Sequence, residues 1–217
     1  MRSGVLMHKK LLISAAAVAA VVAMTACSEA PTPTEIKNAQ VETKQEPAKP
    51  PEPVAAQSAF YQMYKPARTW APDVLALSLV GGEVSSMKSE DGKFPMWTAV
   101  FVSPSLREAR TFTYSVVDDG ATIHKGVSVG GAEPWSGATP KSAPFQTTGF
   151  VINSDDAYKT AYAKAEAWVK KHPGKKVAFS LGSAARFPAP VWFIIWGDTK
   201  SGYAVYVNAT TGTIIGK

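Results

Sequence analysis

Cysteine and histidine are scarce in this chain. Cys27 is the only cysteine among 217 residues, so the protein cannot form an intramolecular disulfide. The three histidines, His8, His124 and His172, are far apart, and no pair of them has the spacing of metal ligands. We therefore expect no zinc site, no other metal site and no cofactor.

A hydrophobic run long enough to cross a membrane is also missing. The longest run extends from Leu11 to Ala23, and thirteen helical residues cover about 20 Å of a bilayer core that is about 30 Å thick. It follows a short basic segment, in which the protein starts at either Met1 or Met7. A charged leader before a short apolar core is typical of a signal peptide, which we assign to residues 1–26.

The end of the apolar run carries an attachment signal. Met24-Thr25-Ala26-Cys27 resembles the bacterial lipobox, with Met24 where leucine is usual. The resemblance implies that Cys27 is lipidated, that it becomes the first residue of the mature protein, and that the chain is anchored in the cell envelope. Ser28 stands where aspartate would favour the inner membrane, which implies the periplasmic face of the outer membrane in a Gram-negative cell. The alternative is a secreted protein with an incidental thiol.

Large apolar residues are rare in the next segment, which we assign as residues 27–57. Its proline-rich composition cannot bury enough surface to offset the entropy lost on ordering, so we expect a disordered tether. Its prolines are Pro31, Pro33, Pro47, Pro50, Pro51 and Pro53.

Charge excludes one class of partner. The formal net charge is +6, but the chain lacks the clustered arginines and the motifs of a nucleic-acid binder. A basic cluster around Pro173–Gly174 is either a solvated helix end or a contact with anionic lipid or polysaccharide. It consists of Lys170, Lys171, Lys175 and Lys176.

No combination of residues indicates catalysis, and we expect that the protein is not an enzyme. Asp118–Asp119 and Asp155–Asp156 are paired carboxylates, but a turn and a helix start explain them structurally. Gly130–Gly131 lacks the strand and helix that flank a phosphate-binding loop, so we interpret it as a turn. His172 suits the negative end of a helix dipole.

Residues 58–150 form the first expected half of the globular region. Pro72 near the start and glycine at the end favour a short helix over residues 72–82. Strands are predicted over 96–102 and 110–117, and residues 121–123 are expected to return to the sheet. Residues 127–148, rich in glycine, serine and proline, read as the connection to the second half.

Residues 151–217 form the second half. The pattern from Ser154 predicts a helix over 154–171, with Ser154 as its cap and with Trp168 at its contact with the sheet. Strands are expected over 177–181, 191–196, 203–207 and 213–215, the last three as an antiparallel meander. Both faces of 191–196 are apolar, and one helix covers only one face, so we expect the first half to cover the other.

The two halves are similar in order. Phe94-Pro95-Met96-Trp97 and Phe187-Pro188-Ala189-Pro190-Val191-Trp192 each lead into strand, loop and strand, followed by a turn with glycine. We interpret this as a degenerate tandem duplication. Two unrelated meanders remain the alternative.

The second half resembles a PepSY domain, through its helix, Trp192 and the ending Tyr203-Ala204-Val205-Tyr206-Val207-Asn208-Ala209-Thr210-Thr211-Gly212. The resemblance implies an α+β fold in which a helix crosses an antiparallel sheet, as in cystatin-like folds. It also implies a non-catalytic domain that binds or modulates an envelope protein, in some relatives a peptidase. A passive envelope spacer and a hydrolase with an unrecognised site remain as alternatives.

Mass spectrometry of the mature N-terminus tests the anchor. We expect a first residue Cys27 carrying lipid, and expect Cys27→Ser to leave an unprocessed or unanchored chain. Cleavage elsewhere, or an unmodified Cys27, would contradict the assignment.

Overall fold

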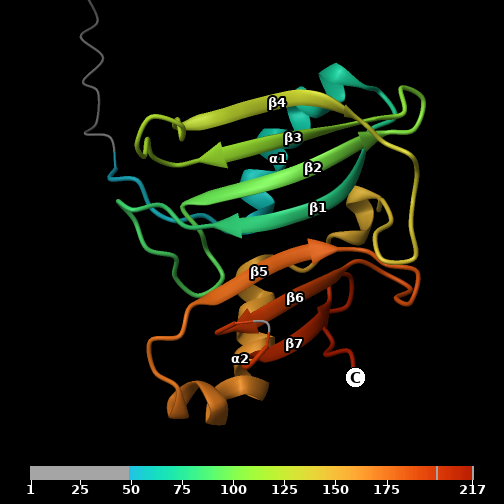
Figure 1. Cartoon of the computed structure of the whole chain (residues 1–217). Coiled ribbons are helices and arrows are strands. Elements are labelled where there is room, and N and C mark those ends of the chain that lie inside the picture. The colour runs from blue at the N-terminus through green and yellow to red at the C-terminus, as the bar shows by residue number, and fades with distance from the viewer. Residues whose placement is uncertain (1–48, 199, 217) are drawn as a thin grey trace, which may run out of the picture. The chain divides into compact units, whose positions relative to one another are not determined.

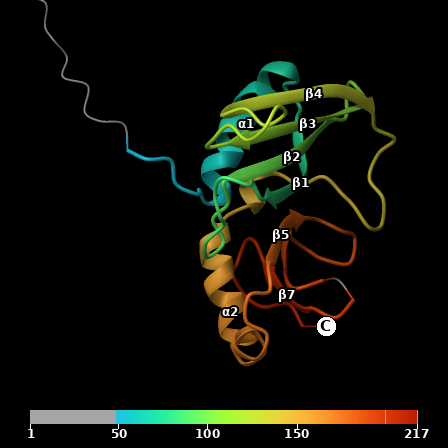
Figure 2. The ribbon, with the colours of Figure 1, turned by 60° about the vertical axis from the view of Figure 1, so that its left-hand side comes forward.

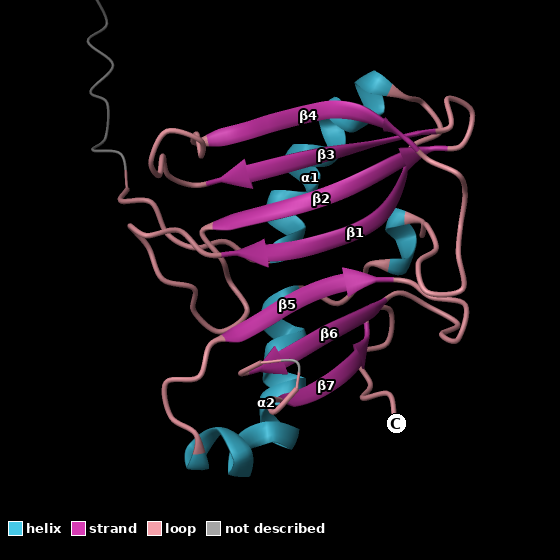
Figure 3. Ribbon diagram, viewed as in Figure 1, coloured by secondary structure: helices cyan, strands magenta, loops and turns pink. Residues whose placement is uncertain are grey.

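Seven strands form one antiparallel sheet in the computed structural model, which describes residues 49–198 and 200–216 (Figure 1). The order across the sheet is β4-β3-β2-β1-β5-β6-β7. The strands are β1 Leu75–Gly82, β2 Met96–Ser103, β3 Glu108–Ser115, β4 Gly126–Pro134, β5 Val177–Gly182, β6 Val191–Trp196 and β7 Tyr203–Asn208. The helices are α1 Ala56–Trp70, α2 Ser154–Lys171 and the short 3-10 helix η1 Thr147–Gly149. The expected α+β class is confirmed (Figure 3).

The two halves meet edge to edge at β1 and β5. Three register pairs join these strands: Ser78 with Gly182, Leu79 with Leu181, and Val80 with Ser180. Pairing satisfies backbone groups that both strands would otherwise leave open. The first half therefore extends the sheet sideways, and our expectation that it covers the second face of β6 is wrong.

Both long helices lie on one side of the sheet, as Figure 2 shows. α1 contacts β1, β2 and β3, whereas α2 contacts β6 and β7. Between helices and sheet lies a single hydrophobic core to which both halves contribute. Its largest fully buried side chains include Trp97, Trp192, Phe60, Phe94, Phe101, Phe112 and Phe179.

Two tryptophans link strands to helix starts in the same way. The Trp97 indole N–H donates to the Val54 carbonyl at 2.9 Å, and the Trp192 indole N–H donates to the Ile152 carbonyl at 2.9 Å. Each carbonyl stands two residues before a helix begins. The two indole rings lie edge to face, 6.2 Å apart, at the centre of the core. Buried indoles with a satisfied N–H contribute both apolar area and orientation.

The start of α1 is capped by residues at the start of α2. Ala55, which precedes α1, provides no side-chain cap. The Ala56 N–H donates to Ser154 Oγ at 2.9 Å, and the Gln57 N–H donates to Asn153 Oδ1 at 3.0 Å. Asn153 also caps α2, by accepting from the Ser154 N–H at 2.9 Å. Ser154 therefore caps the other helix and not its own, contrary to our expectation.

The expected helix over 72–82 is wrong, because this segment is β1. A short apolar run at the centre of a sheet has no period that separates strand from helix. The helix lies earlier, in α1, with buried residues at helical spacing that include Phe60, Met63 and Ala67. Pro66 lies within it and removes one backbone hydrogen bond, which hid the helical pattern. α1 begins at Ala56, inside the segment 27–57 interpreted as tether.

The expected connection over 127–148 is also partly wrong, because Gly126–Pro134 forms the edge strand β4. Gly130–Gly131 lies within it, at a register shift opposite Thr111, and is therefore a bulge and not a turn. Residues 121–123 contribute only an isolated bridge between Asp119 and Ile123.

The remaining expectations for the second half match closely. α2 spans the predicted residues, and β6 has the predicted bounds. Residues 213–215 make a single bridge, between Val207 and Ile214, in place of a strand. Trp168 lies at the end of the helix–sheet contact, half-buried, with its ring 6.1 Å from that of Tyr203.

Ser154→Ala tests the shared helix start. It leaves the buried Ala56 N–H without its acceptor, which should lower the free energy of unfolding by about 1–3 kcal/mol. Urea denaturation followed by tryptophan fluorescence measures the change. Ser128→Ala, at an exposed position of β4, should stay within about 0.5 kcal/mol. Equal stability of the two variants would contradict the capping role.

Candidate binding face of the sheet

One face of the sheet has no helix over it. We call it the open face: it lies opposite α1 and α2 (Figure 2) and consists of the strand side chains that alternate with those of the core. Cross-strand pairing aligns its residues in rows, because residues directly opposite each other in a sheet share a face. The middle row runs through Ser128, Thr113, Thr98, Val80, Ser180, Phe193 and Tyr206. The next row runs through Thr111, Val100, Ser78, Gly182, Val191 and Asn208.

These two rows contain no charged residue. The middle row changes in character across the sheet, from hydroxyl side chains on β3 and β4 to aromatic side chains on β6 and β7, whereas the next row ends in Val191 and Asn208. Val80 at the centre is 44% exposed, and Phe193 and Tyr206 are partly exposed. Except for Val191, which is buried, the two rows are thus a partly exposed surface of small hydroxyl, aliphatic, amide and aromatic groups.

An aromatic cluster closes one end of the open face. It consists of Phe187, from the loop before β6, with Phe193 and Tyr206. The rings of Phe187 and Phe193 lie 6.0 Å apart, and those of Phe193 and Tyr206 lie 5.3 Å apart. The guanidinium carbon of Arg186 lies 4.6 Å from the centre of the Phe187 ring, a cation–π contact.

Two shallow hollows flank the aromatic cluster. One, of about 410 Å³, is lined by Pro140, Lys141, Ala184, Arg186 and Phe193. The other, of about 340 Å³, is lined by Arg186, Phe187, Tyr206 and Gly216. Both hollows therefore combine an aromatic wall with the cationic side chain of Arg186.

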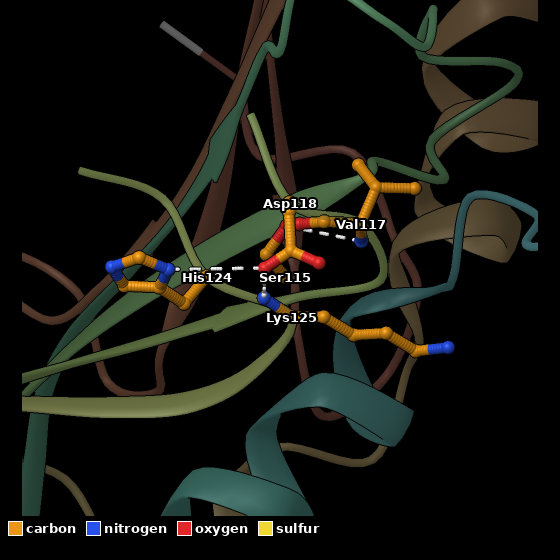
Figure 4. A network of polar contacts seen from close by, with 5 residues as sticks. All are labelled: Ser115, Val117, Asp118, His124 and Lys125. Atoms are coloured by element: carbon orange, nitrogen blue, oxygen red, sulfur yellow. Dashed lines mark hydrogen bonds and ion pairs between the residues drawn. The ribbon is translucent and has the colours of Figure 1, made fainter. Parts of the chain in front are cut away.

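The two carboxylates of Asp118–Asp119 serve different loops. Asp118 accepts a hydrogen bond from the Lys125 backbone N–H at 3.0 Å (Figure 4). Its carboxylate also lies 3.8 Å from His124 Nδ1, and the side chains of Asp118 and His124 are both exposed. Asp119 accepts from the Ser85 hydroxyl and, at 2.6 Å, from the Ser85 N–H. These hydrogen bonds, first that of the hydroxyl, hold the pKa of Asp119 below its usual value. Each carboxylate therefore holds a different loop segment through its own hydrogen bonds.

Asp155–Asp156 belongs to the first turn of α2. Asp156 pairs with Lys159 at 2.8 Å, one turn further along the helix. Within residues 49–198 and 200–216, no three histidine, cysteine, aspartate or glutamate side chains gather as metal ligands would.

The basic residues expected near the end of α2 have local roles. Lys170 pairs with Glu166 at 2.8 Å. The ring of His172 stacks on Trp168 at 4.1 Å, and its Nδ1 lies 2.8 Å from the Trp168 carbonyl. This placement at the helix end agrees with the dipole interpretation.

Cys27 and His8 lie outside the described residues. Over the part of the chain that the structure describes, no helix is both long enough and apolar enough to span a bilayer.

The open face and the aromatic cluster were not found from the sequence. The signal was present, because uncharged residues alternate with core residues in β2 and β6. The side on which both helices pack, and the position of Phe187 over Phe193, depend on tertiary contacts.

The chain was compared with known proteins. No protein-family model matches it, and no curated protein is similar at a significant level. The crystal structure of a candidate lipoprotein from Clostridium difficile 630 is similar, with a TM-score of 0.41 and 9% identity over 73% of this chain and 90% of that one. A likeness of this size does not bear on function.

The Ser85–Asp119 contact can be tested by NMR titration of the carboxyl groups. The pKa of Asp119 should lie below the ordinary aspartate value of about 3.9, and Ser85→Ala should raise it. Because the folded pKa is lowered, the contact stabilises the fold above the unfolded pKa and is lost as the pH falls through the folded value. Ser89→Ala is the matched control, because the Ser89 hydroxyl donates to Glu83 and not to Asp119. It should leave the pKa of Asp119 unchanged. An unshifted Asp119 would contradict the assignment.

Proposed function

We propose that this protein is a membrane-anchored envelope lipoprotein that binds another protein through the open face of its sheet. The lipid on Cys27 would hold it at the membrane, and the proline-rich segment would separate the domain from that membrane. The observation that carries the binding proposal is the open face, which has no helix over it, has no charge in its two rows and ends in the aromatic cluster beside Arg186.

The composition of the open face is that of an interface centre. Fully buried centres of protein interfaces are depleted in charge, and aromatic residues and arginine provide most of the binding energy. The two uncharged rows supply the first property, and Phe193, Tyr206 and Arg186 supply the second. Arg186 and Lys141 at the rim favour a partner that carries carboxylates around an apolar side chain.

The size of the open face also fits a protein partner. Seven strands about 4.8 Å apart span about 30 Å, and six residues of strand extend about 20 Å. The resulting area of about 600 Å² approaches the roughly 800 Å² that each partner contributes to a standard interface.

We further propose that the domain consists of a degenerate tandem pair of PepSY-like units. α2 lies across β5, β6 and β7 as the resemblance implies, and α1 lies across β1, β2 and β3 in the same manner. The matching bonds of Trp97 and Trp192 support it, as does the direct pairing of Val80 with Ser180 between the two first strands. By the same resemblance, the partner is an envelope protein such as a peptidase, which the domain would modulate without catalysing a reaction itself.

Photo-crosslinking in cells tests the binding face. A photoreactive residue replaces Thr98 on the open face, or Tyr61 on the outer side of α1, which is 52% exposed and serves as the matched control. We expect one adduct of defined mass from position 98 and none from position 61. Arg186→Glu should remove the adduct, because it places a negative charge where carboxylates are expected. Equal labelling from both positions would contradict the proposal.

The rival functions give different results in the same cells. A passive spacer gives no adduct, but a phenotype that depends on the length of residues 29–48. A hydrolase gives substrate turnover that a single substitution abolishes while the fold is retained. Either result, obtained without a partner adduct, would contradict the binding function and support the corresponding rival.

A further inference from the structure

β4 is an exposed edge strand with unusual composition. It pairs with β3 on one side, and all of its residues after Gly126 are exposed. From Gly126 to Ala132 it carries neither a charge nor a proline, two of the devices that keep edge strands from pairing with another chain, and its bulge at Gly130–Gly131 lies beyond the regular stretch 127–129. Val127 and Val129 are 37% and 49% exposed. The strand is therefore available for pairing.

The opposite edge of the sheet is covered in part. The Asn208 N–H of β7 donates to the Thr213 carbonyl at 2.8 Å, and the Ile215 N–H donates to the Tyr206 carbonyl at 2.8 Å. The C-terminal segment thus occupies half of the β7 edge. Among residues 49–198 and 200–216, no segment covers β4 in this way.

The register of the sheet indicates which backbone groups of β4 face outward. Val116, which follows β3, donates to the Pro95 carbonyl on the side of β2, so odd-numbered residues of β3 direct their backbone groups to β4. Thr113 pairs with Ser128, whose backbone groups therefore point inward. Val127 and Val129 on either side of Ser128 then point their N–H and carbonyl groups outward. Their side chains lie on the helix-covered face of the sheet, because they pair with Tyr114 and Phe112.

We infer that β4 pairs antiparallel with β4 of a second copy of this chain, and that this makes one continuous sheet across both copies. With Ser128 on the twofold axis, Val127 of each copy lies opposite Val129 of the other. The outward backbone groups of these valines then bond each other, and four valine side chains become neighbours on one face.

The ends of β4 favour a second copy as the occupant. Lys125 precedes the strand and Glu133 lies near its end. Antiparallel pairing brings the basic end of each copy toward the acidic end of the other, so that no like charges meet. A twofold interface is also closed, because it uses the β4 edge of both copies and leaves no free β4 edge to which a third copy could pair. The inference is independent of the proposed function, which uses the open face.

Analytical ultracentrifugation of the full chain with Cys27→Ser, which removes the lipid, measures the pairing. We expect a dimer that dissociates on dilution, and expect Val129→Lys to weaken self-association by about tenfold or more, because two lysines then face the valines across the axis. Val151→Lys is the matched control, at a valine that is 55% exposed and lies outside the sheet, and should leave association unchanged. A monomer at the highest soluble concentration, or equal effects of the two lysines, would overturn the inference.

Disulfide trapping tests the register. In the same Cys27→Ser chain, Ser128→Cys places two thiols across the axis at a position without backbone bonds, where paired Cα atoms lie about 4.5 Å apart, within disulfide range. Mild oxidation should yield a covalent dimer from Ser128→Cys and none from Val151→Cys. A dimer in solution that Ser128→Cys does not trap would place the interface elsewhere and would also overturn the inference.

Discussion

The pairing of β1 with β5 is the constraint on which the rest of the structure depends. Residues directly opposite in a sheet share a face, so the pair Leu79 and Leu181 places the apolar sides of both halves on the same side of the sheet. Both helices must therefore cover that side, and the other side stays open (Figure 2). The same pairing uses the first strand of each half and leaves β4 and β7 as the outer edges. One core, one open face and two edges all follow from three pairs of residues.

A second consequence is that the helix starts meet. The positive ends of α1 and α2 lie close together, which is unfavourable unless their N–H groups have acceptors. Asn153 and Ser154 provide them for α1, and Asn153 also caps α2. Gly92 packs so tightly here that an added Cβ would lie 2.5 Å from the Ser154 carbonyl oxygen, and its φ of 82° is one that glycine adopts readily. The start of α1 depends on Asn153 and Ser154 of the second half, and Trp97 packs against Trp192 across the two halves, so we expect the two to fold as one unit.

The surfaces that remain available differ in chemistry. The open face offers uncharged side chains and an aromatic cluster, which suit the side chains of another protein. The outer edge of β4 offers backbone N–H and carbonyl groups, which suit only another strand. A second copy at the edge would place two open faces in one sheet, and a partner could bind to each. The proposed lipid anchor at Cys27 would bring such copies together on one membrane surface, which would favour even a weak edge contact.

Local patterns were sufficient for several elements. The apolar run of strand-favouring residues in 191–196, the turn residues around it and the apolar stripe from Ser154 predicted β6, β7 and α2, because each pattern reflects contacts within a few residues. The segment 72–82 was misassigned because the bulge between Ala76 and Ser78 interrupts the alternation of β1, because Val80 on the open face is apolar, and because Pro72 imitated a helix start. β4 was missed because its three glycines and its serine match a loop, and only pairing with β3 makes it a strand. Residues about one hundred positions apart join the two halves side by side, and they also provide the cap of α1 through Ser154. The side of the sheet that both helices cover depends on the same pairing. Such contacts leave no period in the chain, so the open face and its aromatic cluster arise only when β1 and β5 pair.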